Sequence, residues 1–232
     1  MKFLAYGATV TGPRHLDLRE SNQDAMALSG NRGGWIAAVA DGLGSRSRSA
    51  HGARHACLTA RKFLRNASSE LDLYSSLPAI HQQWLTAIMP INPKDAATTL
   101  IFARVSKDGI VHAAQLGDGF LLVKSGGKFS RITPERTAFG NQTWALEKNH
   151  LQSEWVTTQF SLSMPGDGLL LMTDGVSDDI EPSQLDNFFN AIYRDLIKKS
   201  RRKGRRWLDT ELNNWATPMH SDDKTLVAIF GT

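Results

Sequence analysis

The chain has 232 residues, of which 41% are hydrophobic and 22% charged, and its net charge is +4; this balance excludes global disorder, a collagen-like chain and a coiled coil. A single cysteine, Cys57, excludes an internal disulfide framework, and no apolar run approaches the roughly 18 residues of a membrane-spanning helix. We therefore expect a soluble protein of a reducing compartment, the cytoplasm, without membrane insertion.

Several segments are expected to form β-strands because each is apolar, partly β-branched and bounded by Gly, Asp or Asn. Gly109 and the pair Gly126-Gly127 predict hairpin turns between neighbouring strands. The expected strands are residues 3–10, 25–29, 35–40, 98–105, 111–116, 120–124, 169–173 and 225–230, with 155–162 as a weaker candidate.

Helices are expected where apolar residues recur every three or four positions. Cys57 lies on such an apolar stripe, which predicts a core position for it. Strands occur in clusters and helices in pairs, so a parallel doubly wound sheet is not expected and antiparallel sheets covered by helix pairs are favoured. The expected helices run from residue 49 onward and over 77–89, 183–199 and 207–215.

Acidic residues stand at the ends of four apolar strands. Asp41, Asp118 and Asp174 each follow a strand and precede a glycine, and Asp222 comes shortly before the last strand. A single Asp-Gly pair is most simply a turn. If these strand ends share one edge, however, their carboxylates converge, and such a cluster persists when a cation offsets the repulsion.

The residue types around these acids favour a hard divalent cation. Oxygen ligands without histidine or thiolate partners suit Mg²⁺ or Mn²⁺ better than zinc. Gly42 would let the backbone approach, so that a carbonyl oxygen joins the ligands. Arg19 precedes the second strand; it is either part of a solvated loop or a planar fork that grips a phosphate.

Short motifs in a characteristic order resemble the metal-dependent serine/threonine protein phosphatases of type 2C, in their compact bacterial form. Each motif alone is weak, but together they extend over nearly the whole chain. The motifs are Arg19-x-x-Asn22-Gln23-Asp24, Val39-Ala40-Asp41-Gly42-Leu43-Gly44, Ala97-Thr98-Thr99-Leu100, Gly117-Asp118, Leu171-Met172-Thr173-Asp174-Gly175-Val176 and Asp222-Asp223-Lys224-Thr225.

The resemblance implies an α+β fold: a four-layer α-β-β-α sandwich of two antiparallel β-sheets flanked by helix pairs, forming one catalytic domain over residues 1–232. It implies hydrolysis of phosphoserine and phosphothreonine in proteins by a water activated between two metal ions. The expected partners are phosphorylated proteins, a nucleic acid is not expected, and the protein is expected to be a monomer.

The resemblance also implies a metal site that holds two ions, Mn²⁺ or Mg²⁺. Asp41 would bridge both ions, and the Gly42 carbonyl would bind one of them. Asp174 and Asp222 would bind the other ion. Asp118, together with Asp174, would hold a weaker third ion.

Two further residues complete the implied site. Asp24 would act mostly through water, and Arg19 would bind the substrate phosphate. No leaving-group acid is identified, because Leu43 stands where many eukaryotic members have a histidine. Gln23, Ser45 and Gly119 also depart from the family pattern. These departures motivate an alternative: a catalytically weak or inactive phosphatase-fold module that binds phosphorylated partners.

Two segments remain open to several interpretations. Residues 194–206 hold eight basic residues and one acid, so the remainder of the chain is slightly acidic. We favour a solvated helix end with its cations near a helix C-terminus, then docking of an acidic or phosphorylated protein, then a nucleic-acid or membrane surface. Residues 139–144 suit a substrate or partner surface and an ordinary loop equally well.

Overall fold

A computed structural model describes residues 1–68, 70–134, 144–149, 152–215 and 221–232. Within these residues the strands form two five-stranded sheets in which all paired neighbours are antiparallel. The first sheet has the order β1 (Phe3–Val10), β10 (Lys224–Gly231), β9 (Gly168–Met172), β6 (Phe120–Ser125) and β7 (Lys128–Arg131). The second has the order β2 (Asp24–Asn31), β3 (Gly34–Asp41), β4 (Leu100–Val105), β5 (Ile110–Leu116) and β8 (Val156–Ser161).

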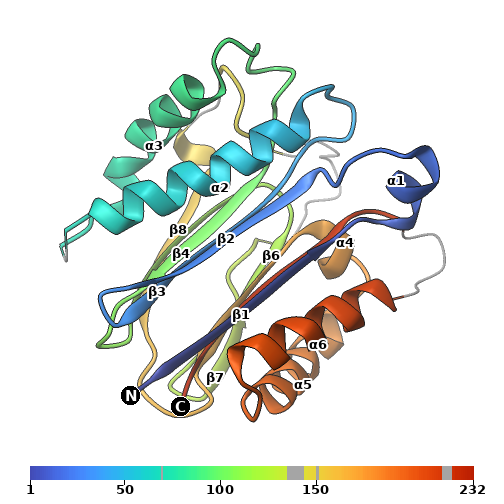
Figure 1. Ribbon diagram of the computed structural model, residues 1–232. Coiled ribbons are helices and arrows are strands. Elements are labelled where there is room, and N and C mark those ends of the chain that lie inside the picture. Colours follow the sequence, from blue (N-terminus) through green and yellow to red (C-terminus); the bar gives the residue numbers. More distant parts are fainter. Residues whose placement is uncertain (69, 135–143, 150–151, 216–220) are drawn as a thin grey trace.

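Pairs of helices cover the outer faces of the two sheets. In Figure 1, α2 (Ser49–Asn66) and α3 (Leu73–Ile88) lie over the second sheet, and α5 (Leu185–Leu196) and α6 (Arg201–Asn213) over the first. The short helices α1 (Pro13–Leu18) and α4 (Asp174–Ser177) lie at the end away from the two chain termini. The predicted four-layer α-β-β-α sandwich of antiparallel sheets is therefore confirmed.

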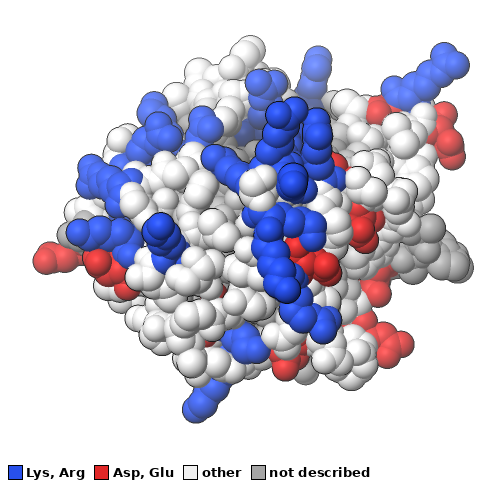
Figure 2. Space-filling model, turned by 60° about the horizontal axis from the view of Figure 1, so that its bottom comes forward, with Lys and Arg blue, Asp and Glu red and all other residues white. Residues whose placement is uncertain are grey.

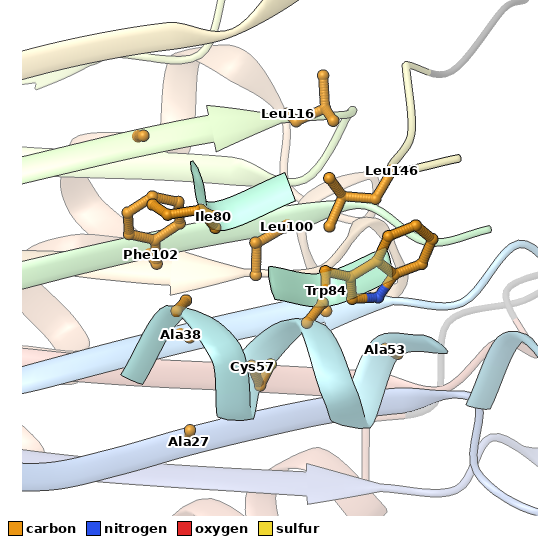
Figure 3. Close-up of a cluster of buried hydrophobic side chains, with 14 of the residues drawn as sticks. Ala27, Ala38, Ala53, Cys57, Ile80, Trp84, Leu100, Phe102, Leu116 and Leu146 are labelled. Carbon is orange, nitrogen blue, oxygen red and sulfur yellow. The ribbon is translucent and has the colours of Figure 1, made fainter. Parts of the chain in front are cut away.

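Three layers of apolar side chains hold the sandwich together. Val39 and Leu171 belong to the layer between the sheets, and Phe189 belongs to the layer under α5 and α6. Phe102 and Trp84 both belong to the layer under α2 and α3, shown in Figure 3. Because each central strand is covered on both faces, it is apolar along its length rather than alternating.

Cys57 occupies the predicted core position. Its side chain is 1% exposed and lies among the residues of Figure 3, and its thiol donates to the carbonyl of Ala25. Burial raises the pKa of this thiol far above its usual range. A buried protonated thiol is a packing group and not a nucleophile.

The structure differs from the expected elements at several places. It adds β7, α1 and α4, starts α3 at Leu73 instead of Leu77, and starts α6 at Arg201 instead of Trp207. Ser200 caps α6 by accepting from the backbone N–H of Lys203. Gly204 lets the helix lie against β1, since a Cβ there would be 2.3 Å from the Tyr6 ring.

The favoured interpretation of the basic segment holds for Arg194, in the last turn of α5, but the earlier start of α6 corrects it for three other cations. Arg201, Arg202 and Lys203 lie in the first turn of α6, not at a helix C-terminus. The two predicted hairpin turns, at Gly109 and at Gly126-Gly127, are confirmed as connections between paired strands. None of the described helices has the length and apolar character needed to cross a lipid bilayer.

Candidate metal centre

The predicted acidic strand ends meet at one end of the sandwich. Asp41 closes β3, Asp174 follows β9 and Asp222 precedes β10. Asp118 occupies the turn between β5 and β6. A cavity of about 190 Å³ is lined by Gln23, Asp41, Gly42, Leu43, Gly44, Asp118, Asp174 and Asp222.

Burial and mutual repulsion disfavour charge on these carboxyl groups. Burial first, and then the charges of Asp24, Asp174, Asp222 and Asp118, raise the pKa of Asp41 well above its usual range. The pKa of Asp174 is raised to about 7 by burial and by Asp118 and Asp222. Burial raises the pKa of Asp24 to about 8. A group of acids that repel one another in a small polar cavity is suited to a bound cation.

Two of the predicted site residues lie outside the cavity lining. Asp24 is not among the lining residues, although it pairs with Asp41 across β2 and β3. Its side chain is buried, with 8% exposed. Arg19 is exposed and caps the C-terminal end of α1 in the left-handed region, with φ of 56°. The structure thus brings Asp41, Gly42 and three further acids to one cavity, and Arg19 is not part of its lining.

Adjacent threonines hold the backbone of Asp41. The Asp41 N–H donates to Thr99 Oγ1 over 2.9 Å. Its carbonyl accepts from the Thr99 N–H at 2.8 Å and from Thr98 Oγ1 at 2.7 Å. These bonds involve only main-chain atoms of Asp41. They hold the backbone that carries the carboxylate and do not use either carboxylate oxygen.

A third threonine connects Asp24 to the end of β9. Thr173 Oγ1 donates to Asp24 Oδ2 at 2.7 Å. The same hydroxyl accepts from the backbone N–H of Thr225 at 3.1 Å. Since Thr173 immediately precedes Asp174, this buried hydroxyl sets the relative positions of two acids from different sheets.

A buried glutamine shapes the turn that carries Asp118. The side-chain nitrogen of Gln115 donates to the carbonyls of Gly117 and Gly119, on either side of Asp118. Thr133 Oγ1 donates to Gln115 Oε1 at 2.7 Å. The sequence interpretation did not include this residue, although a glutamine within an otherwise apolar strand was a usable signal.

Asp223 was also missed, and it anchors the segments that precede β2. Its carboxylate accepts from the backbone N–H of Gly12 at 2.7 Å and of Gln23 at 2.6 Å. His15 Nδ1 lies 2.9 Å from the same carboxylate. The side chain is 2% exposed, so it positions Gln23 at the cavity rather than facing the cavity itself.

Replacing Asp223 by alanine is expected to lower the free energy of unfolding by about 3 kcal/mol or more, because two buried N–H groups lose a charged acceptor. Urea unfolding of the metal-free protein measures the change. Asp222→Ala is the matched control, since Asp222 is exposed and lies beside other acids. It should change stability by less than about 1 kcal/mol. Equal losses in both variants would contradict an anchoring role for Asp223.

The proposed surface at residues 139–144 falls almost entirely outside the described residues, which omit 135–143. Trp144 itself is described and is 46% exposed.

Comparisons with known proteins agree with this geometry. The family model for protein phosphatase 2C matches residues 11–215. The photosystem II phosphatase PBCP has a TM-score of 0.70 and 16% identity, with 99% of both chains covered. Stp1 from Staphylococcus aureus has a TM-score of 0.69 and 18% identity, covering 100% of this chain and 96% of that one.

A third solved structure is the catalytic domain of the serine/threonine phosphatase PstP in complex with two manganese ions. Its TM-score is 0.67 at 18% identity, with 98% of this chain and 97% of that chain covered. A search of curated protein sequences found no match. Since the family match extends over most of the chain and includes Asp41, Asp118 and Asp174, the chain belongs to the protein phosphatase 2C family of protein-serine/threonine phosphatases.

Proposed function

We propose that this protein hydrolyses phosphoserine and phosphothreonine in proteins, with two divalent cations, Mn²⁺ or Mg²⁺, at the carboxylate cavity. The observation that carries the proposal is the convergence of Asp41, Asp118, Asp174 and Asp222 on one small cavity. These side chains come from four strand ends far apart in the sequence. Turn formation alone gives no reason for them to meet.

The donor set fits hard cations. Asp41 would hold both ions, the Gly42 carbonyl one of them, and Asp174 and Asp222 the other. Asp118 with Asp174 would hold a weaker third ion. When bound, such cations supply a water of lowered pKa and positive charge beside the phosphoryl oxygens. The raised pKa values of Asp41 and Asp174 support this assignment, because a cation offsets the repulsion that raises them.

Other residues would bind and orient the substrate. Arg19, exposed at the C-terminal end of α1, would grip the phosphate with its guanidinium fork. Asp24 would act through an intervening water from its position opposite Asp41 on the neighbouring strand β2. Leu43 lines the cavity but has no proton to donate, so the leaving serine or threonine oxygen would take its proton from solvent.

Phosphate release from a phosphothreonine peptide tests the proposal. With Mn²⁺ present we expect turnover, and after chelation by EDTA we expect turnover at background level, because the carboxylates alone repel a phosphate. Adding Mn²⁺ back should restore the rate. Turnover that survives chelation would contradict the mechanism. Tight phosphopeptide binding without turnover, at any Mn²⁺ or Mg²⁺ concentration, would instead identify a phospho-binding regulatory module.

The proposal includes one catalytic domain over residues 1–232 that acts as a monomer in the cytoplasm. The location is supported by the lone, buried thiol of Cys57, which is compatible with a reducing compartment. Light scattering of the purified protein would test the monomer.

A further inference from the structure

A group of cations, all exposed except the partly buried Lys199, lies at the end of the molecule opposite the carboxylate cavity. This basic surface comprises Arg194, Lys198, Lys199, Arg201, Arg202, Lys203, Arg205 and Arg206. Figure 2 shows lysine and arginine side chains gathered on this face, over α6. The Arg201 guanidinium carbon lies 4.9 Å from the ring centroid of Trp35, at the start of β3. Asp41 ends that strand six residues later, about 20 Å away.

Three of these cations occupy a position that is unfavourable for the helix that carries them. Arg201, Arg202 and Lys203 occupy the first turn of α6, which contains no acidic residue. The positive end of the helix dipole repels cations there. Their charges also repel one another across the exposed surface. Helix stability therefore does not account for Arg201, Arg202 and Lys203.

Few acids neutralise this surface. Among the residues that the structure describes, the carboxylates within 4.0 Å of its cations are Asp195, at 4.0 Å from Lys199, and Asp209, at 3.8 Å from Arg205. In both pairs the partners are four residues apart and at least one side chain is exposed, so the pairs neutralise little charge. Most of the positive charge remains available to an external anion.

Aromatic rings hold part of the surface in place. Arg201 stacks on Trp35, and the Lys199 ammonium lies 5.0 Å from the ring centroid of Trp207. Five of the eight cations are arginines, whose planar forks match carboxylates with paired hydrogen bonds. Such preordered forks bind an acidic chain at a lower entropic cost than free lysines would.

We propose that the basic surface is a docking site for an acidic segment, rich in Asp and Glu, of a partner protein. A lipid surface is disfavoured because the large exposed apolar side chains of the described residues lie outside 194–206. Base stacking on a single-stranded nucleic acid is disfavoured because Trp35 and Trp207 already carry a cation on the ring. The docking proposal does not depend on phosphatase activity.

Fluorescence anisotropy with a labelled oligoglutamate peptide tests the proposal, with oligoglutamine of the same length as the neutral probe. The variant is Arg202→Glu/Lys203→Glu, which reverses two exposed charges in the first turn of α6. We expect oligoglutamate affinity to fall about tenfold or more, and binding by the original chain to weaken with added salt. The melting temperature should stay the same or rise, because acids in a first helical turn are favourable.

The matched control is Lys62→Glu/Arg65→Glu, which makes the same change in net charge at exposed positions of α2. It should keep oligoglutamate affinity within about twofold. An equal loss in both variants, or no oligoglutamate binding by the original chain, would overturn the proposal. So would stronger charge-dependent binding to phosphatidylserine vesicles or duplex DNA than to the peptide, since the surface would then serve a different class of partner.

Discussion

Replacing Asp41 by asparagine is expected to lower kcat for phosphothreonine peptide hydrolysis by about a thousandfold or more. Asparagine has nearly the same shape but lacks the charge with which Asp41 would hold both ions, so the electrostatic stabilisation of the transition state is lost. The main-chain bonds to Thr98 and Thr99 remain, because they do not involve the carboxylate. Steady-state kinetics at saturating Mn²⁺ measures the effect.

Thermal unfolding separates this loss of activity from misfolding. Without metal, Asp41→Asn should be at least as stable as the original chain, because it removes one of several acids that repel one another. Asp108→Asn is a suitable control, since Asp108 is an exposed acid in the hairpin between β4 and β5, at the far end from the cavity. An Asp41→Asn protein that keeps a tenth of the activity would rule out the proposed bridging role.

The metal-free protein is expected to lose stability as the pH rises from about 4 to about 8. In the unfolded chain Asp24 and Asp174 titrate near pH 4, whereas in the fold burial raises their pKa values to about 8 and about 7. Between these limits the native state binds more protons than the unfolded state. The stability that these two acids contribute is therefore fully present below pH 4 and is lost as the pH rises. The expected loss, measured by urea unfolding, is on the order of several kcal/mol.

Added Mn²⁺ should reverse this loss at pH 8. A cation that binds the folded cluster and not the unfolded chain stabilises the fold by mass action. Asp41→Asn should show both a smaller pH-dependent loss and a smaller gain with Mn²⁺. A stability that rises between pH 4 and 8 in the metal-free protein would show that the acids are not held in mutual repulsion.

Much of the fold was visible in the sequence because of how the layers cover one another. A strand buried on both faces is a continuous apolar run, so β1 was predicted with its observed bounds, residues 3–10. β7 was missed because Phe129 is its only apolar residue and it pairs at a sheet edge. α6 was predicted to start too late, because its first turns are cationic and contain no apolar periodicity before Trp207.

The sequence by itself determined the two-sheet class, the acidic strand ends and the kind of cation that they suit. Only the tertiary structure decided that Asp24 pairs with Asp41, that Arg19 lies outside the cavity lining and that Asp223 anchors the neighbouring segments. It also placed the basic surface at the end opposite the cavity. The physical reason is that local periodicity encodes which face of an element is buried, whereas these relations depend on the register between strands far apart in the chain.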